Sequence, residues 1–258
     1  MNPAAPDPAG LNLLHAALLF GVGAVAGVLN VLAGGGSLLT LPVLIFLGLP
    51  SAMANGTNRV AILVQNIVAV QGFRHRKALP LKLALICTVP ALVGSVLGAK
   101  LAIDVSDAAF RRILAGVMIG VCTLMVLDPA KRWRFDPATL TRARLAALAA
   151  TFLVVGLYGG FVQAGVGFII ITGLLVHGLD MVRINAVKVF VVGVYTISAL
   201  LVFVRAGQVD WALGLALAAG NAVGGWLGSQ LAVDKGHDWL RRAVLVVAVA
   251  FAVKLFWR

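Results

Sequence analysis

Charged residues are scarce in this sequence, and that scarcity sets the class of protein. Only 12% of the 258 residues are charged, whereas 61% are hydrophobic, and the mean hydropathy is +1.03. A soluble domain carries roughly 25% charged residues, so the composition excludes an ordinary soluble enzyme or binding module. We expect an integral membrane protein whose apolar segments occupy nearly the whole chain.

Glutamate is absent and cysteine is rare. The nine acidic residues are all Asp, near the ends of apolar runs or in loops, so a carboxylate proton relay or sodium site has no obvious parts. Cys87 and Cys122 lie in different apolar runs without a CxxC motif, which gives no support to metal or dithiol chemistry. We therefore expect no cofactor and no metal. The opening "MNPAAPDPAG" has no Lys or Arg, so the first apolar run is expected to be retained rather than cleaved as a signal.

Positive charge is present in excess, with a formal net charge of +12. The Lys and Arg residues lie mainly between apolar runs, where basic residues hold loops on the cytoplasmic side of a membrane. We therefore expect a multi-pass membrane protein. The expected environment is a lipid bilayer, and no nucleic acid is expected as a partner.

Ten apolar runs are divided by a basic linker, "DPAKRWRFDPATLTRAR", at 128–144. The linker separates a first transmembrane repeat (1–127) from a second (145–258). The second run of each half, 36–49 or 166–179, would rise only about 21 Å as a helix, too little to cross a ~30 Å hydrocarbon core. The predicted fold class is all-α, with eight full transmembrane helices and two short segments. The runs lie at about 11–33, 36–49, 55–72, 79–102, 108–127, 145–162, 166–179, 184–205, 209–232 and 239–257.

The two halves repeat each other. "GSVLGAKLA" at 94–102 matches "GGWLGSQLA" at 224–232 with a spacing of 130 residues, and the same spacing relates Asn55 to Asn185. A constant spacing over most of each half indicates internal duplication. Inverted halves place more of the Lys and Arg residues on the cytoplasmic side than parallel halves do, so we expect inverted repeats with broken helices. In such transporters the binding site lies at the interface between the repeats.

The candidate site lies where glycines break the apolar runs. Three glycines, Gly34 to Gly36, and then Ser37 lie at the start of the first short segment, and "NGTNR" (55–59) is predicted to start the third segment. A helix start exposes N–H groups and carries roughly half a positive charge, which favours an anion. The candidate substrate-binding residues are Gly34, Gly35, Gly36, Ser37, Asn55, Thr57, Asn58, Arg59, Gln65, Gln163, Gly165, Gly167, Asn185, Lys188 and Tyr195.

Each of these features also has a structural interpretation. Glycines in membrane helices often serve close packing, and Arg59 and Lys188 could extend to the membrane surface. Gln65, Asn66 and Tyr195 lie deeper in the third segments and could line a cavity, whereas Asn30 is expected to be a packing contact. The functional alternatives are an importer or channel for another small anion, a membrane enzyme or thiol-relay protein, and a scaffold.

The stretch "AGGGSLLTLPVLIFLGLPSAMANGTNR" (33–59) and its weaker echo "QAGVGFIIITGLLVHGLDMVRINAVK" (163–188) resemble the TauE/SafE sulfite exporter family. The resemblance covers nearly the whole chain and implies a bacterial inner-membrane carrier that exports small sulfur-containing anions such as sulfite or sulfoacetate. The second half departs from the pattern, because Val166 interrupts the glycines and Val187 replaces the threonine. We expect the second half to bind less of the ligand, or to bind it through Lys188.

Overall fold

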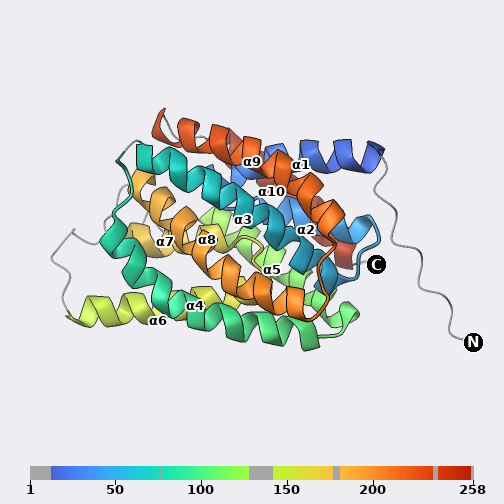
Figure 1. Cartoon of the computed structure of the whole chain (residues 1–258), viewed down its shortest axis with the longest axis horizontal. Coiled ribbons are helices and arrows are strands. Elements are labelled where there is room, and N and C mark those ends of the chain that lie inside the picture. Colours follow the sequence, from blue (N-terminus) through green and yellow to red (C-terminus); the bar gives the residue numbers. More distant parts are fainter. Residues whose placement is uncertain (1–12, 76, 128–141, 177–180, 235–237, 257–258) are drawn as a thin grey trace, which may run out of the picture.

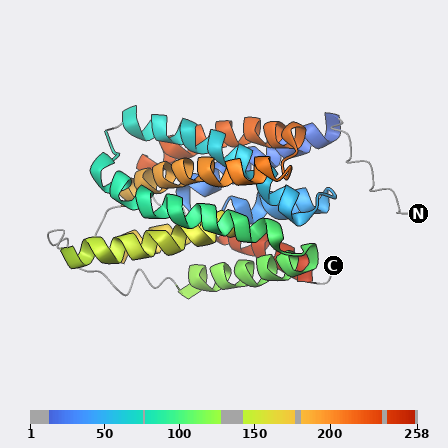
Figure 2. The same cartoon turned by 60° about the horizontal axis from the view of Figure 1, so that its bottom comes forward.

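The structure is a computed structural model that describes residues 13–75, 77–127, 142–176, 181–234 and 238–256. Within these ranges every regular element is an α-helix. Figures 1 and 2 both show the long helices lying side by side along one axis of the molecule. In chain order the helices are α1 (Leu13–Leu32), α2 (Ser37–Phe46), α3 (Ser51–His75), α4 (Leu81–Asp104), α5 (Asp107–Leu127), α6 (Arg142–Phe161), α7 (Val166–Val176), α8 (Met181–Arg205), α9 (Trp211–Asp234) and α10 (Asp238–Phe256).

The alternation of long and short segments is confirmed in the described residues. Helices α2 and α7 have 10 and 11 residues, whereas the others have between 19 and 25. Most bounds agree with the apolar runs to within one helical turn. The predicted linker lies outside the described residues as far as 141, and α6 already begins at Arg142, so the last three linker residues belong to a helix.

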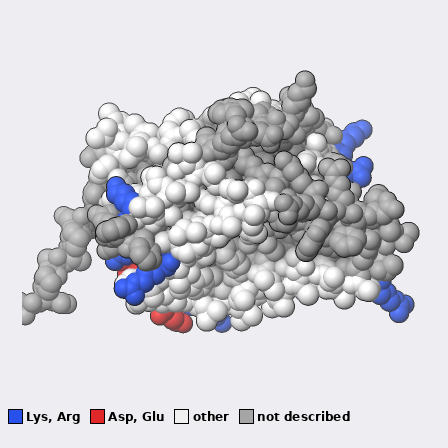
Figure 3. All heavy atoms as spheres, turned by 180° about the vertical axis from the view of Figure 1, so that it is seen from behind, with Lys and Arg blue, Asp and Glu red and all other residues white. Residues whose placement is uncertain are grey.

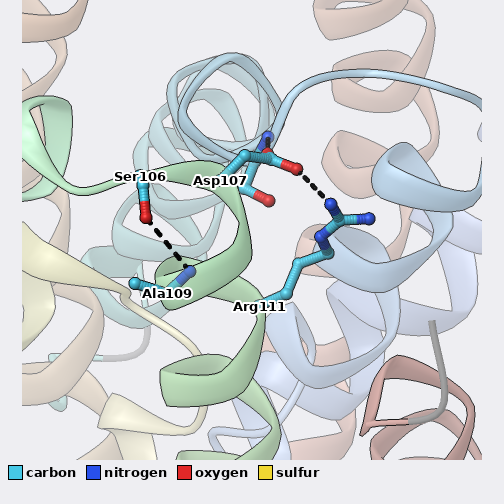
Figure 4. Close-up of polar contacts among 5 residues, drawn as sticks. Ser106, Asp107, Ala109 and Arg111 are labelled. Atoms are coloured by element: carbon cyan, nitrogen blue, oxygen red, sulfur yellow. Dashed lines mark hydrogen bonds and ion pairs between the residues drawn. The ribbon is translucent and has the colours of Figure 1, made fainter.

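The predicted start of the third segment at residue 55 is wrong. Helix α3 begins at Ser51, so "NGTNR" lies inside the helix. The reason is a carboxylate from another helix: the Ser51 N–H donates to Asp107 Oδ1 at 2.5 Å. This contact satisfies one of the N–H groups that a helix start leaves without an intrahelical partner. Figure 4 shows the same Asp107 paired with Arg111 at 2.6 Å, beside the Ser106 hydroxyl that accepts from the Ala109 N–H.

Helix packing follows the same plan in both halves. Helix α1 packs against α9, and its counterpart α6 packs against α4, which is the counterpart of α9. The two central helices, α3 and α8, pack against each other, and each also packs against α9 or α4. Helix α5 packs against α10. Each contact between two helices therefore has a counterpart between the two corresponding helices of the other half, as internal duplication predicts.

Small residues allow the outer pairs to approach closely. A Cβ on Gly220 of α9 would lie 2.0 Å from the carbonyl oxygen of Phe20 on α1. A Cβ on Gly94 of α4 would lie 2.2 Å from the carbonyl oxygen of Leu153 on α6. Neither position has room for a side chain, and such contacts between backbones are typical of helices packed within membranes.

The outer surface has the apolar character of a membrane protein. On α4, Val89, Val93, Leu97 and Leu101 are 51–65% exposed and follow each other at every fourth position. A soluble monomer rarely exposes such a continuous apolar stripe. Figure 3 shows most of the visible Lys and Arg toward the two ends of one face, and the described residues between them are mainly uncharged. Among the described helices, α1, α4 and α8 are long and apolar enough by composition to cross a membrane.

Candidate functional site

Two breaks in the helices form the centre of the site. Helix α1 ends at Leu32 and α2 begins at Ser37, while α6 ends at Phe161 and α7 begins at Val166. The backbone reverses at Gly34 and Gly165, which have φ angles of +79° and +70°. A side chain costs energy in this left-handed region, and glycine avoids that cost.

The two breaks touch. A Cβ on Gly34 would lie 2.5 Å from the Cα of Gly167, and a Cβ on Gly167 would lie 2.3 Å from the Cα of Gly34. Residues 34–37 and 162–167 are all buried. The tertiary structure thus brings together two glycine motifs that lie about half the chain apart, one from each half.

Helices α2 and α7 both start at this contact. The first N–H groups of a helix have no partner within that helix, and its amino-terminal end carries roughly half a positive charge. Both starts are buried, since Ser37 is 4% exposed and Val166 is 4% exposed. The predicted helix starts are therefore confirmed at the two breaks, although not at "NGTNR".

Arg59 is buried completely and is held mainly by acceptors at the carboxyl end of α6 and just beyond it. One guanidinium nitrogen donates to the Gly159 carbonyl at 3.1 Å and to Gln163 Oε1 at 2.9 Å, and the other donates to the Gly160 carbonyl. Asn55, one turn earlier on α3, accepts from Arg59 at 3.3 Å and donates to the Phe161 carbonyl at 2.7 Å. These carbonyls belong to the last turn of α6, the negative end of the helix dipole.

Lys188 plays the corresponding part in the second half. Its Nζ donates to the Val31 carbonyl at 2.7 Å, in the last turn of α1, and to Asn185 Oδ1 at 2.8 Å. Each central helix therefore uses an Asn and a cation to hold the carboxyl end of the broken helix from the other half. Neither cation extends to the membrane surface, because Arg59 is 0% and Lys188 is 2% exposed.

A cavity of about 10 Å³ lies beside the two breaks, which is room for about one water molecule. Four predicted site residues line it: Ser37, Gln163, Gly167 and Lys188. The other lining residues are Asn30, Asn66, Val166 and Val192. Arg59 is not among them, but it reaches the wall through Gln163.

Asn30 makes the contact between helices that was expected of it, and it has a second position that was not expected. Its amide donates to Gln65 Oε1 at 3.1 Å, and it also lines the cavity. Its position one turn before Gly34, in the last turn of an otherwise apolar helix, is the sequence signal that could have identified it. Gln65 itself lies behind Asn30, and no hydrogen-bond partner is described for its buried Nε2.

The remaining predicted residues are buried around this centre, with different partners. Asn58 accepts from the Thr40 hydroxyl at 2.6 Å, and Thr57 accepts from the Asp210 N–H at 2.9 Å. The Tyr195 hydroxyl lies against Gly159, where a Cβ would be 2.5 Å away. These contacts join the halves and neighbouring helices without reaching the cavity wall.

The architecture defines a class: a multi-pass, all-helical membrane protein with two broken helices that meet at a buried polar centre. The family model described as "Sulfite exporter TauE/SafE" matches residues 19–255. The chain belongs to this family, and it is a membrane transporter.

Similar proteins carry only general names. A "Probable membrane transporter protein" of Haemophilus influenzae is 27% identical over 96% of both chains. The "Probable membrane transporter protein YfcA" of Escherichia coli K12 is 29% identical over 93% of this chain and 89% of its own. The "Probable membrane transporter protein ORF9" of a Sinorhizobium species is 27% identical over 93% of this chain and 91% of its own. No solved structure gives a significant match.

Proposed function

We propose that this protein is a secondary transporter that exports a small sulfur-containing anion, such as sulfite or sulfoacetate, across a bacterial inner membrane. Transport proceeds by alternating access, with the anion bound between the two halves. The description of the family as sulfite exporters supports the substrate class.

The observation that carries the proposal is the meeting of two helix starts and one cation at a single cavity. Ser37 and Val166 begin α2 and α7, and both line the cavity together with Lys188. Helix starts and a lysine both attract negative charge. The amides of Asn30 and Asn66, also in the wall, can donate to the oxygens of a sulfite or sulfonate group.

The size of the cavity supports a moving site. At about 10 Å³ it has room for one water, whereas sulfite has four heavy atoms. The walls must separate to admit the anion, and they come from both halves: Ser37 from the first, Gln163 and Lys188 from the second. Movement of one half against the other opens the cavity to one side of the membrane at a time.

The arrangement of the chain supports inverted halves. In Figure 1, α3 starts at the end of the molecule where the N terminus is marked, and its counterpart α8 starts at the opposite end. Helix α2, with 10 residues, rises about 15 Å, so it reaches only part of the way across a ~30 Å core. We propose that the eight long helices cross the membrane and that α2 and α7 end within it.

The test is a binding screen of the purified protein against sulfite, sulfate, thiosulfate, sulfoacetate and taurine. We expect an anion to bind best, and we expect Lys188→Ala and Arg59→Ala each to weaken its affinity. The loss should be larger for Lys188, which lines the cavity, than for Arg59, which acts through Gln163.

Two results would contradict the proposal. If zwitterionic taurine binds best, the site does not select negative charge. If both variants keep the affinity of the wild type, the cations do not act on the anion. Flux measurements in proteoliposomes under opposite gradients then separate an exporter from an importer, and saturation of the flux separates a carrier from a channel.

A further inference from the structure

Lys188 is a buried basic side chain without a negative partner among the described residues. It is 2% exposed, and both of its hydrogen-bond acceptors, the Val31 carbonyl and the Asn185 amide oxygen, are uncharged. Its ammonium group has three donors, and its side chain also lines the cavity. A buried ammonium without a counter-charge is strongly disfavoured, whereas a neutral amine at the same place is not.

The helices packed against α8 offer no compensating negative charge in the residues described. The other buried titratable side chains are Arg59 on α3, Cys87 on α4 and Tyr195 on α8 itself, and Tyr158 on α6 is partly buried. Helices α1, α7 and α9 contribute no buried titratable side chain in their described residues. Arg59 carries a permanent positive charge and contacts Gln163 in the cavity wall. It therefore disfavours a second positive charge at Lys188.

An anion in the cavity changes this balance. Its negative charge next to Nζ stabilises the ammonium form, and by linkage a proton on Nζ strengthens anion binding by the same factor. We propose that Lys188 is the proton-binding site of this transporter, taking up one proton on Nζ as the anion enters the cavity and releasing it as the anion leaves. This inference rests on the proposed anion transport.

Cotransport of one proton affects the direction in which the membrane potential drives the anion. A dianion that moves with one proton carries a net charge of −1. A membrane potential that is negative inside therefore still drives the loaded site outward, in agreement with export. Coupling of this kind does not require a carboxylate in the membrane, and the sequence has no Glu at all.

The experiment measures proton uptake when an anion binds to the purified wild-type protein. The probes are thiosulfate and sulfoacetate, whose own charges stay constant between about pH 6 and pH 9. In weakly buffered solution with a pH indicator, we expect uptake of up to one proton per bound anion. We also expect the affinity to fall by up to tenfold per pH unit over the range in which uptake is seen.

Two variants assign the proton to Lys188. Lys188→Arg keeps a cation that does not titrate in this range, so it should bind the anion without proton uptake and without the pH dependence. Lys188→Met should bind weakly at every pH. Lys100→Arg, the same exchange at an exposed position of α4, is the control and should behave as the wild type does.

Each outcome decides something. Anion binding without proton uptake in the wild type overturns the proton site and leaves anion transport standing. Proton uptake that persists in Lys188→Arg shows that another group takes up the proton, which overturns the assignment. If Lys188→Arg does not fold, the wild-type measurement still decides whether anion and proton binding are coupled. Absence of binding for every probe at every pH overturns the proposed function itself.

Discussion

Replacement of Arg59 by Met tests whether a cation on one half holds the broken helix of the other. Met fills a similar volume but removes every guanidinium donor. The structure describes four acceptors for these donors: the carbonyls of Gly159 and Gly160, Gln163 Oε1 and Asn55 Oδ1. The variant therefore leaves the Gly159 and Gly160 carbonyls in the last turn of α6 without their guanidinium donors.

The magnitude follows from the count of hydrogen bonds. Hydrogen bonds between side chains within membranes contribute on average about 0.6 kcal/mol and at most about 1.7 kcal/mol. Four such bonds give roughly 2–3 kcal/mol at the average value. The contact of the guanidinium with the Phe203 ring, 4.7 Å to its centroid, adds about 0.5–2 kcal/mol, but removing a buried charge offsets a similar amount. We expect a loss of roughly 2–3 kcal/mol, which lowers the Tm by roughly 4–12 °C.

The assay is thermal unfolding in detergent, followed by tryptophan fluorescence and by the fraction that remains monodisperse. Arg112→Met, at an exposed position of α5, is the matched control and should melt as the wild type does. Arg59→Lys should fall between the wild type and Arg59→Met, since lysine keeps the charge but not the fork of donors. Equal melting temperatures for Arg59→Met and Arg112→Met would refute the proposed role of Arg59.

Three further predictions concern other parts of the molecule. Gly34→Ala should abolish folding or transport, because the new Cβ would lie 2.5 Å from Gly167 Cα and the backbone φ angle is +79°. The control is Gly116→Ala, which should melt and transport as the wild type does, because nothing lies within 4 Å of its new Cβ. Asp107→Ala should lower stability by about 1 kcal/mol, measured by thermal unfolding, because α3 loses the carboxylate at its amino-terminal end. The double change of Cys87 and Cys122 to Ser should leave transport intact, and loss of transport in a correctly folded variant would favour the thiol-relay alternative.

Much of the fold could be predicted from local patterns. Apolar runs separated by polar residues identify membrane helices, and their lengths distinguish α2 and α7 from the others, because hydrophobicity and length are properties of each segment alone. The start of α3 could not be predicted in this way. The sequence "NGTNR" has the composition of a helix start. The start of α3 in the structure is at Ser51, where the N–H donates to Asp107 from another helix.

The residues of the site could be predicted, but their hydrogen-bond partners could not. The glycine motifs and the two cations could be found because they interrupt apolar runs at nearly matching positions in the two halves, 131 residues apart for Gly34 and Gly165 and 129 for Arg59 and Lys188. Their partners could not be found, because Arg59 reaches Gly159 and Lys188 reaches Val31 across separations of 100 and 157 residues. Asn30 was expected only to pack, although its position one turn before Gly34 is a signal in the sequence that it lies near the break.

The sequence alone therefore determined that this protein lies in a membrane, is duplicated and breaks two of its helices, because these properties follow from the composition and order of neighbouring residues. Only the tertiary structure decided that the two breaks meet, that Arg59 and Lys188 hold helix carboxyl ends, and that Lys188 rather than Arg59 lines the cavity. The physical reason is that buried polar groups must find partners, and Arg59 and Lys188 each find some of theirs in the other half of the chain.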